Sequence, residues 1–230
     1  MENEEFFQRT ELLLGAATMR ALAQTRVLLV GTGGVGSWCA EALVRTGVGR
    51  LALVDADRVC PSNVNRQLMA TRRTLGEPKV ESLARRLQEI NPAADITTVM
   101  GVYSADTAST FKLEEYDYVI DAIDSVAEKA HLIRHALSIP SVTLFSSMGA
   151  ARRLDSFRIR TSEFWKVQGD GLARALRNRF RKSGEFPSRK FTCVWSDEPP
   201  RAGAGTVMHV TAAFGLALAS LVIRAVCAKI

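Results

Sequence analysis

A glycine-rich segment is the first place in the sequence where residue types and spacing could do chemistry. Gly31-Thr32-Gly33-Gly34-Val35-Gly36-Ser37 follows an apolar run and precedes a segment with helical periodicity. Glycines let a backbone approach an anion closely, and a helix that begins there offers free N–H groups and a partial positive charge to phosphates. Asp55 ends the next apolar run, where a carboxylate can bind ribose hydroxyls. Together these features predict a nucleotide site, for either a nicotinamide dinucleotide or ATP.

Charged residues further along the chain distinguish the two nucleotides. Asn63-Val64-Asn65-Arg66-Gln67 and Gly76-Glu77-Pro78-Lys79 supply an arginine fork and a lysine point charge. A site that cleaves ATP needs such cations for the departing pyrophosphate, whereas a hydride-transfer site does not. Asp124, three residues after Asp121, could hold Mg²⁺ beside a triphosphate. Each residue alone could be a surface group or a helix cap, but the set in this order favours ATP with Mg²⁺ over NAD.

The elements that must position these residues alternate between strands and helices. Apolar runs predict strands at residues 26–30, 50–55, 95–101, 116–121 and 140–145. Helical spacing predicts helices at residues 11–24, 37–46, 77–90, 127–138 and 172–183. This alternation predicts an α/β fold with a Rossmann-like, mainly parallel sheet and helices on both faces. We expect one domain over residues 1–230, with a nucleotide-binding core in 1–150 and a C-terminal extension of the sheet and helices in 151–230.

The apolar stretch at residues 207–226 needs a separate interpretation. It is about long enough to span a bilayer, but polar and charged residues interrupt it. We expect a strand at residues 206–213 and a buried helix at residues 214–228, and no integral membrane span. Peripheral membrane association through this stretch is the alternative.

Positive charge is concentrated in one part of the chain. The net charge is +6, and residues 151–190 hold 12 Lys and Arg against 4 Asp and Glu. A local excess of this kind is typical of a surface that meets a polyanion, and also of a solvated helix face.

The four cysteines argue against a structural zinc site. They lie far apart, with no CxxC pair among them, so a zinc ribbon and a thioredoxin-type redox motif are both unsupported. Widely spaced cysteines in a chain of this size predict reduced thiols and a cytoplasmic location. These residues are Cys39, Cys60, Cys193 and Cys227.

The motifs GTGGVGS, VDAD, NVNRQ, GEPK and DAIDS resemble those of the ubiquitin-activating-like (ThiF/MoeB-like) adenylating superfamily. The resemblance covers residues 5–150 and implies an enzyme that activates a carboxylate as an acyl-adenylate. It implies that Gly31, Gly33, Gly34 and Gly36 line the phosphates, that Asp55 binds the ribose, and that Asn63, Arg66 and Lys79 contact the triphosphate. It also implies that Asp124 coordinates magnesium. Arg9 resembles an arginine that members insert into the partner subunit's site, which implies a homodimer in which residues 151–230 serve substrate binding and dimerisation.

Finer features resemble one bacterial branch of the superfamily, the tRNA threonylcarbamoyladenosine dehydratases. They are GGVGSWCAEALVRTGVG, DRVCPSNVNRQ, Ile90-Asn91-Pro92 and VIDAIDSVAEKAHLI. This resemblance implies that ATP adenylates the threonyl carboxylate of a modified adenosine beside the tRNA anticodon, and that the carbamoyl group then closes a ring and displaces AMP. It also implies a cysteine desulfurase or other sulfur-acceptor system as a further partner.

Three other functions remain as alternatives. The first is an activator of a small ubiquitin-like sulfur-carrier protein that ends in Gly-Gly, which often holds structural zinc. The others are a nucleotide-binding adaptor without catalysis and a nicotinamide-dependent oxidoreductase. The basic segment at residues 151–190 and the lack of CxxC pairs favour the tRNA enzyme over the carrier activator.

Overall fold

A seven-stranded sheet organises the chain, which the structure, a computed structural model, describes over residues 6–230. In order across the sheet, the strands are β3 (Asp95–Val99), β2 (Arg50–Val54), β1 (Arg26–Val30), β4 (Tyr118–Asp121), β5 (Thr143–Ser147), β7 (Thr192–Ser196) and β6 (Ile159–Glu163). Neighbours pair in parallel except β6, which runs antiparallel to β7 at the sheet edge. The chain builds outward from β1 on one side and from β4 on the other, so the order reverses between them, and ligands bind at such a point in α/β sheets.

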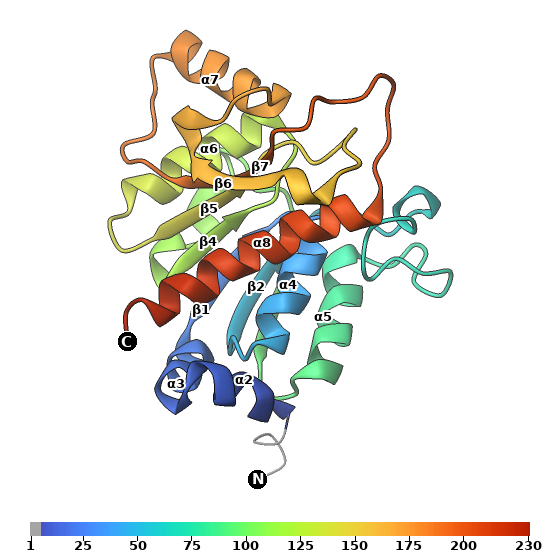
Figure 1. Ribbon diagram of the computed structural model, residues 1–230, viewed down its shortest axis with the longest axis vertical. Helices are drawn as coiled ribbons and strands as arrows, with labels where there is room; N and C mark the ends of the chain where they lie inside the picture. The colour runs from blue at the N-terminus through green and yellow to red at the C-terminus, as the bar shows by residue number, and fades with distance from the viewer. Residues whose placement is uncertain (1–5) are drawn as a thin grey trace.

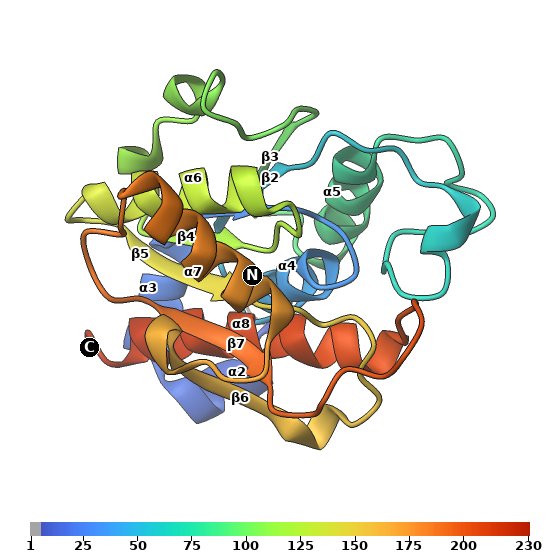
Figure 2. The same ribbon diagram turned by 90° about the horizontal axis from the view of Figure 1, so that it is seen from above.

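Helices cover both faces of the sheet, which confirms the predicted α/β class (Figures 1 and 2). One face carries α3 (Ala16–Gln24), α4 (Gly36–Arg45), α5 (Lys79–Ile90) and α8 (Met208–Cys227), and the other carries α6 (Val126–Ser138) and α7 (Gly171–Ser183). The central strands are buried on both faces because each is a short run of Val, Leu and Ile. Apart from the helix expected at residues 11–24, the expected strands and helices up to residue 183 are found with their ends shifted by a few residues.

The prediction of a strand at residues 206–213 is wrong. Residues 208–227 form one helix, α8, because Val210, Phe214 and Leu218 recur every fourth residue and all bury against α4 and the sheet. By length and composition α8 could cross a membrane, but half of its apolar stretch is buried inside the protein. It is an apolar core helix, lying diagonally across the sheet in Figure 1.

Two further differences concern elements that the sequence pattern hides. The strands β6 and β7 were not expected, because IRTSE and TCVWS contain too many polar residues to form apolar runs. The single helix expected at residues 11–24 is two helices, α2 (Gln8–Leu14) and α3. They meet at Gly15, whose φ of +81° lies in the region that favours glycine and interrupts the helix.

The contact between α8 and α4 generates a stability prediction. A Cβ added to Gly215 would lie 2.3 Å from the carbonyl oxygen of Val35 and 2.8 Å from the amide nitrogen of Cys39, both backbone atoms of the first turn of α4. We expect Gly215→Ala to destabilise the fold by about 1–3 kcal/mol because α8 must move away. The matched control is Gly171→Ala in α7, where an added Cβ meets only the end of Arg174 at 4.0 Å. It should be neutral or gain up to about 1 kcal/mol of helix propensity. Urea unfolding of both variants would measure the difference, and equal free energies of unfolding would contradict the proposed close packing.

Candidate functional site

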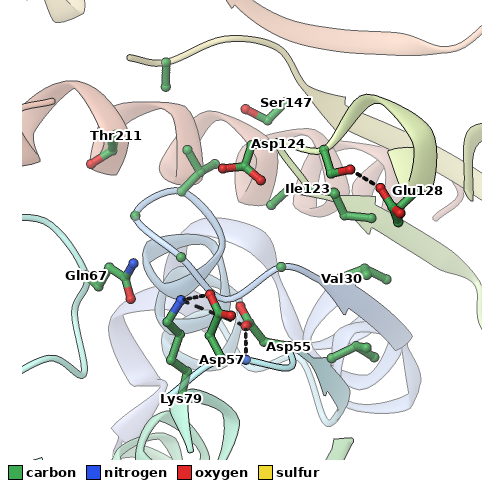
Figure 3. Close-up of a pocket in the computed structure, with 18 of the residues that line it drawn as sticks. Val30, Asp55, Asp57, Gln67, Lys79, Ile123, Asp124, Glu128, Ser147 and Thr211 are labelled. Atoms are coloured by element: carbon green, nitrogen blue, oxygen red, sulfur yellow. Dashed lines mark hydrogen bonds and ion pairs between the residues drawn. The ribbon is translucent and has the colours of Figure 1, made fainter. Parts of the chain in front are cut away.

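A cavity of about 690 Å³ opens at the carboxyl ends of the central parallel strands (Figure 3). Loops that follow five of the strands form its walls. They are Gly31–Val35 after β1, Asp55–Asp57 after β2, Gly101–Tyr103 after β3, Ala122–Ser125 after β4 and Met148–Ala151 after β5, with Ser147 at the end of β5 itself. The volume is within the range of small-molecule sites.

The glycine loop forms the floor of this cavity. Gly31 has a φ of +92°, and a Cβ on it would lie 2.7 Å from the carbonyl oxygen of Ala122, so the loop is pressed against the end of β4. A Cβ on Gly36 would overlap the carbonyl oxygen of Gly31, at 1.8 Å. The loop therefore folds back tightly on itself and turns straight into α4, whose amino-terminal end carries a partial positive charge that suits an anion.

Asp55 braces the loop from the next strand. Its Oδ2 accepts hydrogen bonds from the Thr32 amide at 2.7 Å and the Thr32 hydroxyl at 3.0 Å, and its Oδ1 accepts the Asp57 amide at 2.9 Å. The predicted ribose ligand thus also holds the phosphate loop in shape.

Lys79 enters the cavity from the start of α5. Its side chain is almost fully buried, with Nζ 2.6 Å from Oδ2 of Asp57 and 4.0 Å from Oδ1 of Asp55 (Figure 3). A bound polyphosphate would compete with the largely exposed Asp57 carboxylate for this ammonium group. Sequence reasoning assigned no role to Asp57, although the VDAD motif contains it.

Arg66 belongs to a turn that packs against α4. The indole N–H of Trp38 donates to the Arg66 carbonyl oxygen at 3.0 Å, while Arg66 Nη1 donates to the Ser62 carbonyl oxygen at 2.8 Å and to Asn65 Oδ1 at 2.9 Å. The Asn63 side chain accepts the Cys60 amide at 3.1 Å. These bonds hold the half-buried Arg66 in the wall of the cavity, which Asp124 also lines from the loop after β4.

Most of the predicted site residues therefore meet in one place. The cavity lining includes Gly31, Gly33, Gly34, Asp55, Asn63, Arg66, Lys79 and Asp124. Gly36 lies just beneath it and contacts Gly31. Arg9 is not brought to the cavity of its own chain, because it is exposed on α2, which lies with α3 at the amino ends of the strands (Figure 1). The structure also adds Gln67, Tyr103 and Glu128 to the lining, which sequence reasoning missed.

Tyr103 is held by a histidine on the far side of the wall. Its hydroxyl lies 2.5 Å from Nδ1 of His135, and the His131 ring lies next to both. Burial lowers the pKa of His135, and the charge of His131 lowers it further, so the His135 imidazole is neutral near pH 7. Burial also raises the pKa of Tyr103, which keeps its hydroxyl protonated. The sequence spacing of the two histidines gave no signal of this contact.

The charges that line the cavity do not balance. Among the described lining residues, four carboxylates (Asp55, Asp57, Asp124 and Glu128) stand against the two cations Arg66 and Lys79. A polyphosphate bound here would meet a net negative wall, so its binding calls for additional positive charge. A divalent cation at the exposed Asp124 carboxylate fits this requirement, and so does a cation delivered from outside the chain.

The cavity continues beyond the glycine loop. Its lining also includes Met148–Ala151, Leu172 and Thr206, together with Thr211, which lies beside Gly34. A second cavity of about 440 Å³ adjoins it and shares Arg66, Ala151 and Thr206 with the first. Arg66 thus lies where the two cavities meet.

The cysteines differ in reactivity. All four are free, and burial raises the pKa values of Cys39 and Cys193, so these two are unreactive thiols. Cys60 is exposed near the cavity, and a hydrogen bond with Ser62 lowers its pKa, with a smaller contribution from Lys79.

The basic segment at residues 151–190 is only partly available to a partner. Arg153 is buried with a nitrogen 3.6 Å from Asp170, Arg177 Nη1 donates to the Phe164 and Val167 carbonyl oxygens, and Arg189 donates to carbonyl oxygens at the end of α6. Of the other basic residues, those that are exposed and in no ion pair are Arg152, Lys166, Arg174, Arg179, Arg181, Lys182 and Lys190, whereas Arg158 and Arg160 pair with Asp197. The free positive charge of this segment therefore lies mainly along the outer face of α7.

Comparisons with known proteins agree with this geometry. A model described as the ThiF family matches residues 7–229. The chain is 40% identical, over 84% of its length and 75% of the relative, to tRNA threonylcarbamoyladenosine dehydratase of Bacillus subtilis. It is 38% identical, over 90% of its length and 80% of the relative, to tRNA threonylcarbamoyladenosine dehydratase of Escherichia coli. The crystal structure of the E. coli enzyme TcdA in complex with ATP superposes with a TM-score of 0.92 and 36% identity, covering 98% of this chain and 95% of that one.

Proposed function

The chain belongs to the ThiF family, and from this premise we propose that it is an ATP-dependent tRNA threonylcarbamoyladenosine dehydratase. One observation carries the proposal. In a chain similar over nearly its whole length to such dehydratases, Arg66, Lys79 and Asp124 converge with the glycine loop on a single cavity that continues into a second compartment. That arrangement suits a nucleotide and a carboxylate that reacts with it.

The residues suggest how the first step proceeds. The glycine loop and the start of α4 hold the phosphates, and Asp55 holds the ribose while bracing the loop. The threonyl carboxylate of the modified adenosine enters from the second compartment and attacks the α-phosphorus, and pyrophosphate leaves. Arg66 and Lys79 stabilise the charge that develops on pyrophosphate. Magnesium, held by Asp124, would supply further charge neutralisation. In the second step the carbamoyl group attacks the acyl carbon, a ring closes and AMP leaves.

A homodimer is part of the proposal. The net negative cavity wall calls for a further cation, and Arg9 on the exposed α2 is the residue proposed to supply it to a second copy of the chain. The side chains of Leu12 and Leu13 on the same helix are about four-fifths exposed, at 80% and 82%, as apolar residues at an interface would be in an isolated subunit.

The proposal also covers the location of the chain, a further partner and an alternative function. The four free cysteines fit a cytoplasmic location. A cysteine desulfurase system remains a proposed partner, and the exposed Cys60 is the thiol that such a system could reach. Activation of a sulfur-carrier protein is the alternative function, and it predicts AMP formation with a Gly-Gly-ending carrier in place of tRNA.

The first prediction from the proposed function concerns the chemistry. Removing one pre-organised cation from the developing pyrophosphate should cost about two to four kcal/mol of barrier, so Arg66→Ala and Lys79→Ala should lose AMP formation by about 10²- to 10³-fold. Asp124→Ala should lose Mg²⁺-dependent turnover. Arg73→Ala, an exposed cation outside the cavity lining, is the control. AMP release measured with modified tRNA tests all four, and a near-normal rate in any of the first three would remove that residue from the proposed site.

The second prediction concerns the shared site. Mixing Arg9→Ala with Lys79→Ala subunits creates heterodimers with one complete site, so activity should recover to about a quarter of the unmodified level after random exchange. Mixing equal amounts of the unmodified chain and the double variant Arg9→Ala/Lys79→Ala creates heterodimers with no complete site, so activity should fall on exchange from about a half to about a quarter of the unmodified level, all of it from the remaining unmodified homodimers. Native mass spectrometry would verify exchange, and heterodimers without recovered activity would count against a site completed by Arg9.

The third prediction concerns tRNA. Arg177 is bound to backbone carbonyl oxygens, so we choose Arg174 and Arg181, which are both exposed and lie two turns apart on one face of α7. Replacing both with alanine should weaken tRNA binding and reduce the slope of log affinity against log salt by about two, because two phosphate contacts are lost. Arg50→Ala/Lys112→Ala, which removes two exposed charges at the amino ends of the strands, should change neither. Filter binding over a salt series measures both quantities. An identical loss in the two double variants would mean that α7 carries no specific tRNA surface.

A further inference from the structure

A fully buried ion pair lies beneath the loop that carries Asp124. Asp121, the last residue of β4, and Lys129, in α6, have side chains that are completely buried, with Lys129 Nζ 2.9 Å from Asp121 Oδ2. The Ser146 hydroxyl on β5 donates to the same oxygen at 2.7 Å. A buried ion pair is often no more stabilising than apolar residues of similar volume, because both charges lose their hydration. Its position under the loop that carries Asp124 therefore suggests a role other than stability.

The pair holds both polar groups of one residue in that loop. The Ile123 amide donates to Asp121 Oδ1 at 3.1 Å, and the Ile123 carbonyl oxygen accepts from Lys129 Nζ at 2.9 Å. Ile123 directly precedes Asp124. Rotating either peptide group beside Ile123 would break a hydrogen bond to a fully buried charged group, which is costly where no water can replace it.

The same loop is joined to the phosphate loop on its other side. The Ala122 amide donates to the Val30 carbonyl oxygen at 2.9 Å, and the Ala122 carbonyl oxygen is the atom that Gly31 approaches so closely. The backbone from Ala122 to Ile123 is thus held between the ion pair and the glycine loop. Asp124 itself is exposed, so the orientation of its side chain depends on how the backbone of Ala122 and Ile123 is fixed.

We infer that Asp121 and Lys129 are positioning residues, which act through Ile123 to aim the Asp124 carboxylate at the divalent cation of a nucleotide–metal complex. The inference rests on the proposed function, since it assumes that Asp124 binds a metal beside a nucleotide. Lys129 does not line the cavity and would touch neither substrate nor metal. If the ion pair only stabilised the fold, its effect would depend on the two opposite charges. The hydrogen bond from Lys129 to the Ile123 carbonyl oxygen would then not affect metal binding.

Two neutral double variants separate these roles. Asp121→Asn/Lys129→Gln keeps an amide donor near the Ile123 carbonyl oxygen, whereas Asp121→Asn/Lys129→Met has similar volume and charge but no donor there. Both avoid the unpaired buried charge that Lys129→Met alone would leave. Ser146→Ala removes one hydrogen bond to Asp121 but leaves the ion pair and both Ile123 contacts, so it is the control.

The probe is Mn²⁺ in the presence of a non-hydrolysable ATP analogue, followed by electron paramagnetic resonance. We expect the Met-containing variant to bind Mn²⁺ at least about tenfold more weakly than the unmodified protein, with a matching rise in the Mg²⁺ concentration for half-maximal AMP formation. The Gln-containing variant and Ser146→Ala should stay close to the unmodified protein, and binding of the analogue without metal should change in none of them. A folded Met-containing variant with unchanged Mn²⁺ affinity would overturn the inference.

Amide hydrogen exchange on the unmodified protein tests the same hold without any variant. The Ile123 amide should exchange as slowly as those of β4, because its hydrogen bond to Asp121 opens only when the buried pair opens. Exchange at the rate of an exposed loop would overturn the inference even if no variant folds. If the unmodified protein binds no Mn²⁺ with the analogue, the proposed function fails, and the exchange result still decides whether the pair holds Ile123.

Discussion

The close approach of two backbone segments, at the point where the strand order reverses, is the constraint on which the site depends. Gly31 must have a positive φ and no side chain, because the carbonyl oxygen of Ala122 occupies the space beside it. This contact turns the chain from β1 directly into α4 and leaves the helix start open toward the cavity. It also couples the phosphate loop to the loop that carries Asp124. Any residue larger than glycine at position 31 would separate the two halves of the site.

Electrostatics then decides what the cavity can bind. The described residues that line it include more carboxylates than cations. The ammonium group of Lys79, which belongs to this lining, is already paired with Asp57. If the chain binds ATP here as proposed, binding would draw on charge from elsewhere, from a divalent metal and from a second subunit. The proposed dependence would couple catalysis to assembly, because without both additions the phosphates meet a wall of the same sign. It would also give the exposed Arg9 on α2 a role at a cavity that lies at the other end of its own sheet.

The sequence predicts the sheet core well and long-range contacts poorly. Strands such as Arg26–Val30 are short apolar runs next to glycine turns, so the pattern alone locates them and the phosphate loop that follows. The strands β6 and β7 are not predicted because they contain many polar residues. The first turns of α8 are predicted as a strand because they contain apolar residues typical of a buried strand. Motif residues such as Arg66 and Lys79 could be assigned to one site because their order along the chain carries the signal.

What the pattern cannot show is how each side chain is used. Four arginines contribute equally to the net charge: Arg153, Arg174, Arg177 and Arg189. Yet all but Arg174 use their guanidinium groups in contacts within the protein. The buried contact between Asp121 and Lys129 joins residues eight apart in a motif region where the sequence suggests only an acidic loop and a helix. Such roles depend on burial and on partners, which become visible only when the chain is folded.

The central claim is that the carboxylate of the modified adenosine attacks the α-phosphorus of ATP. Transfer RNA labelled with ¹⁸O at both oxygens of the threonyl carboxylate would test it most directly, with AMP analysed by mass spectrometry after a single turnover. If the acyl-adenylate forms, the bridging oxygen comes from the carboxylate and leaves with AMP when the ring closes, so AMP should carry one ¹⁸O atom and the tRNA should lose one. Unlabelled AMP together with cyclised tRNA, or no AMP at all, would show that the chain activates its substrate in another way or activates a different one.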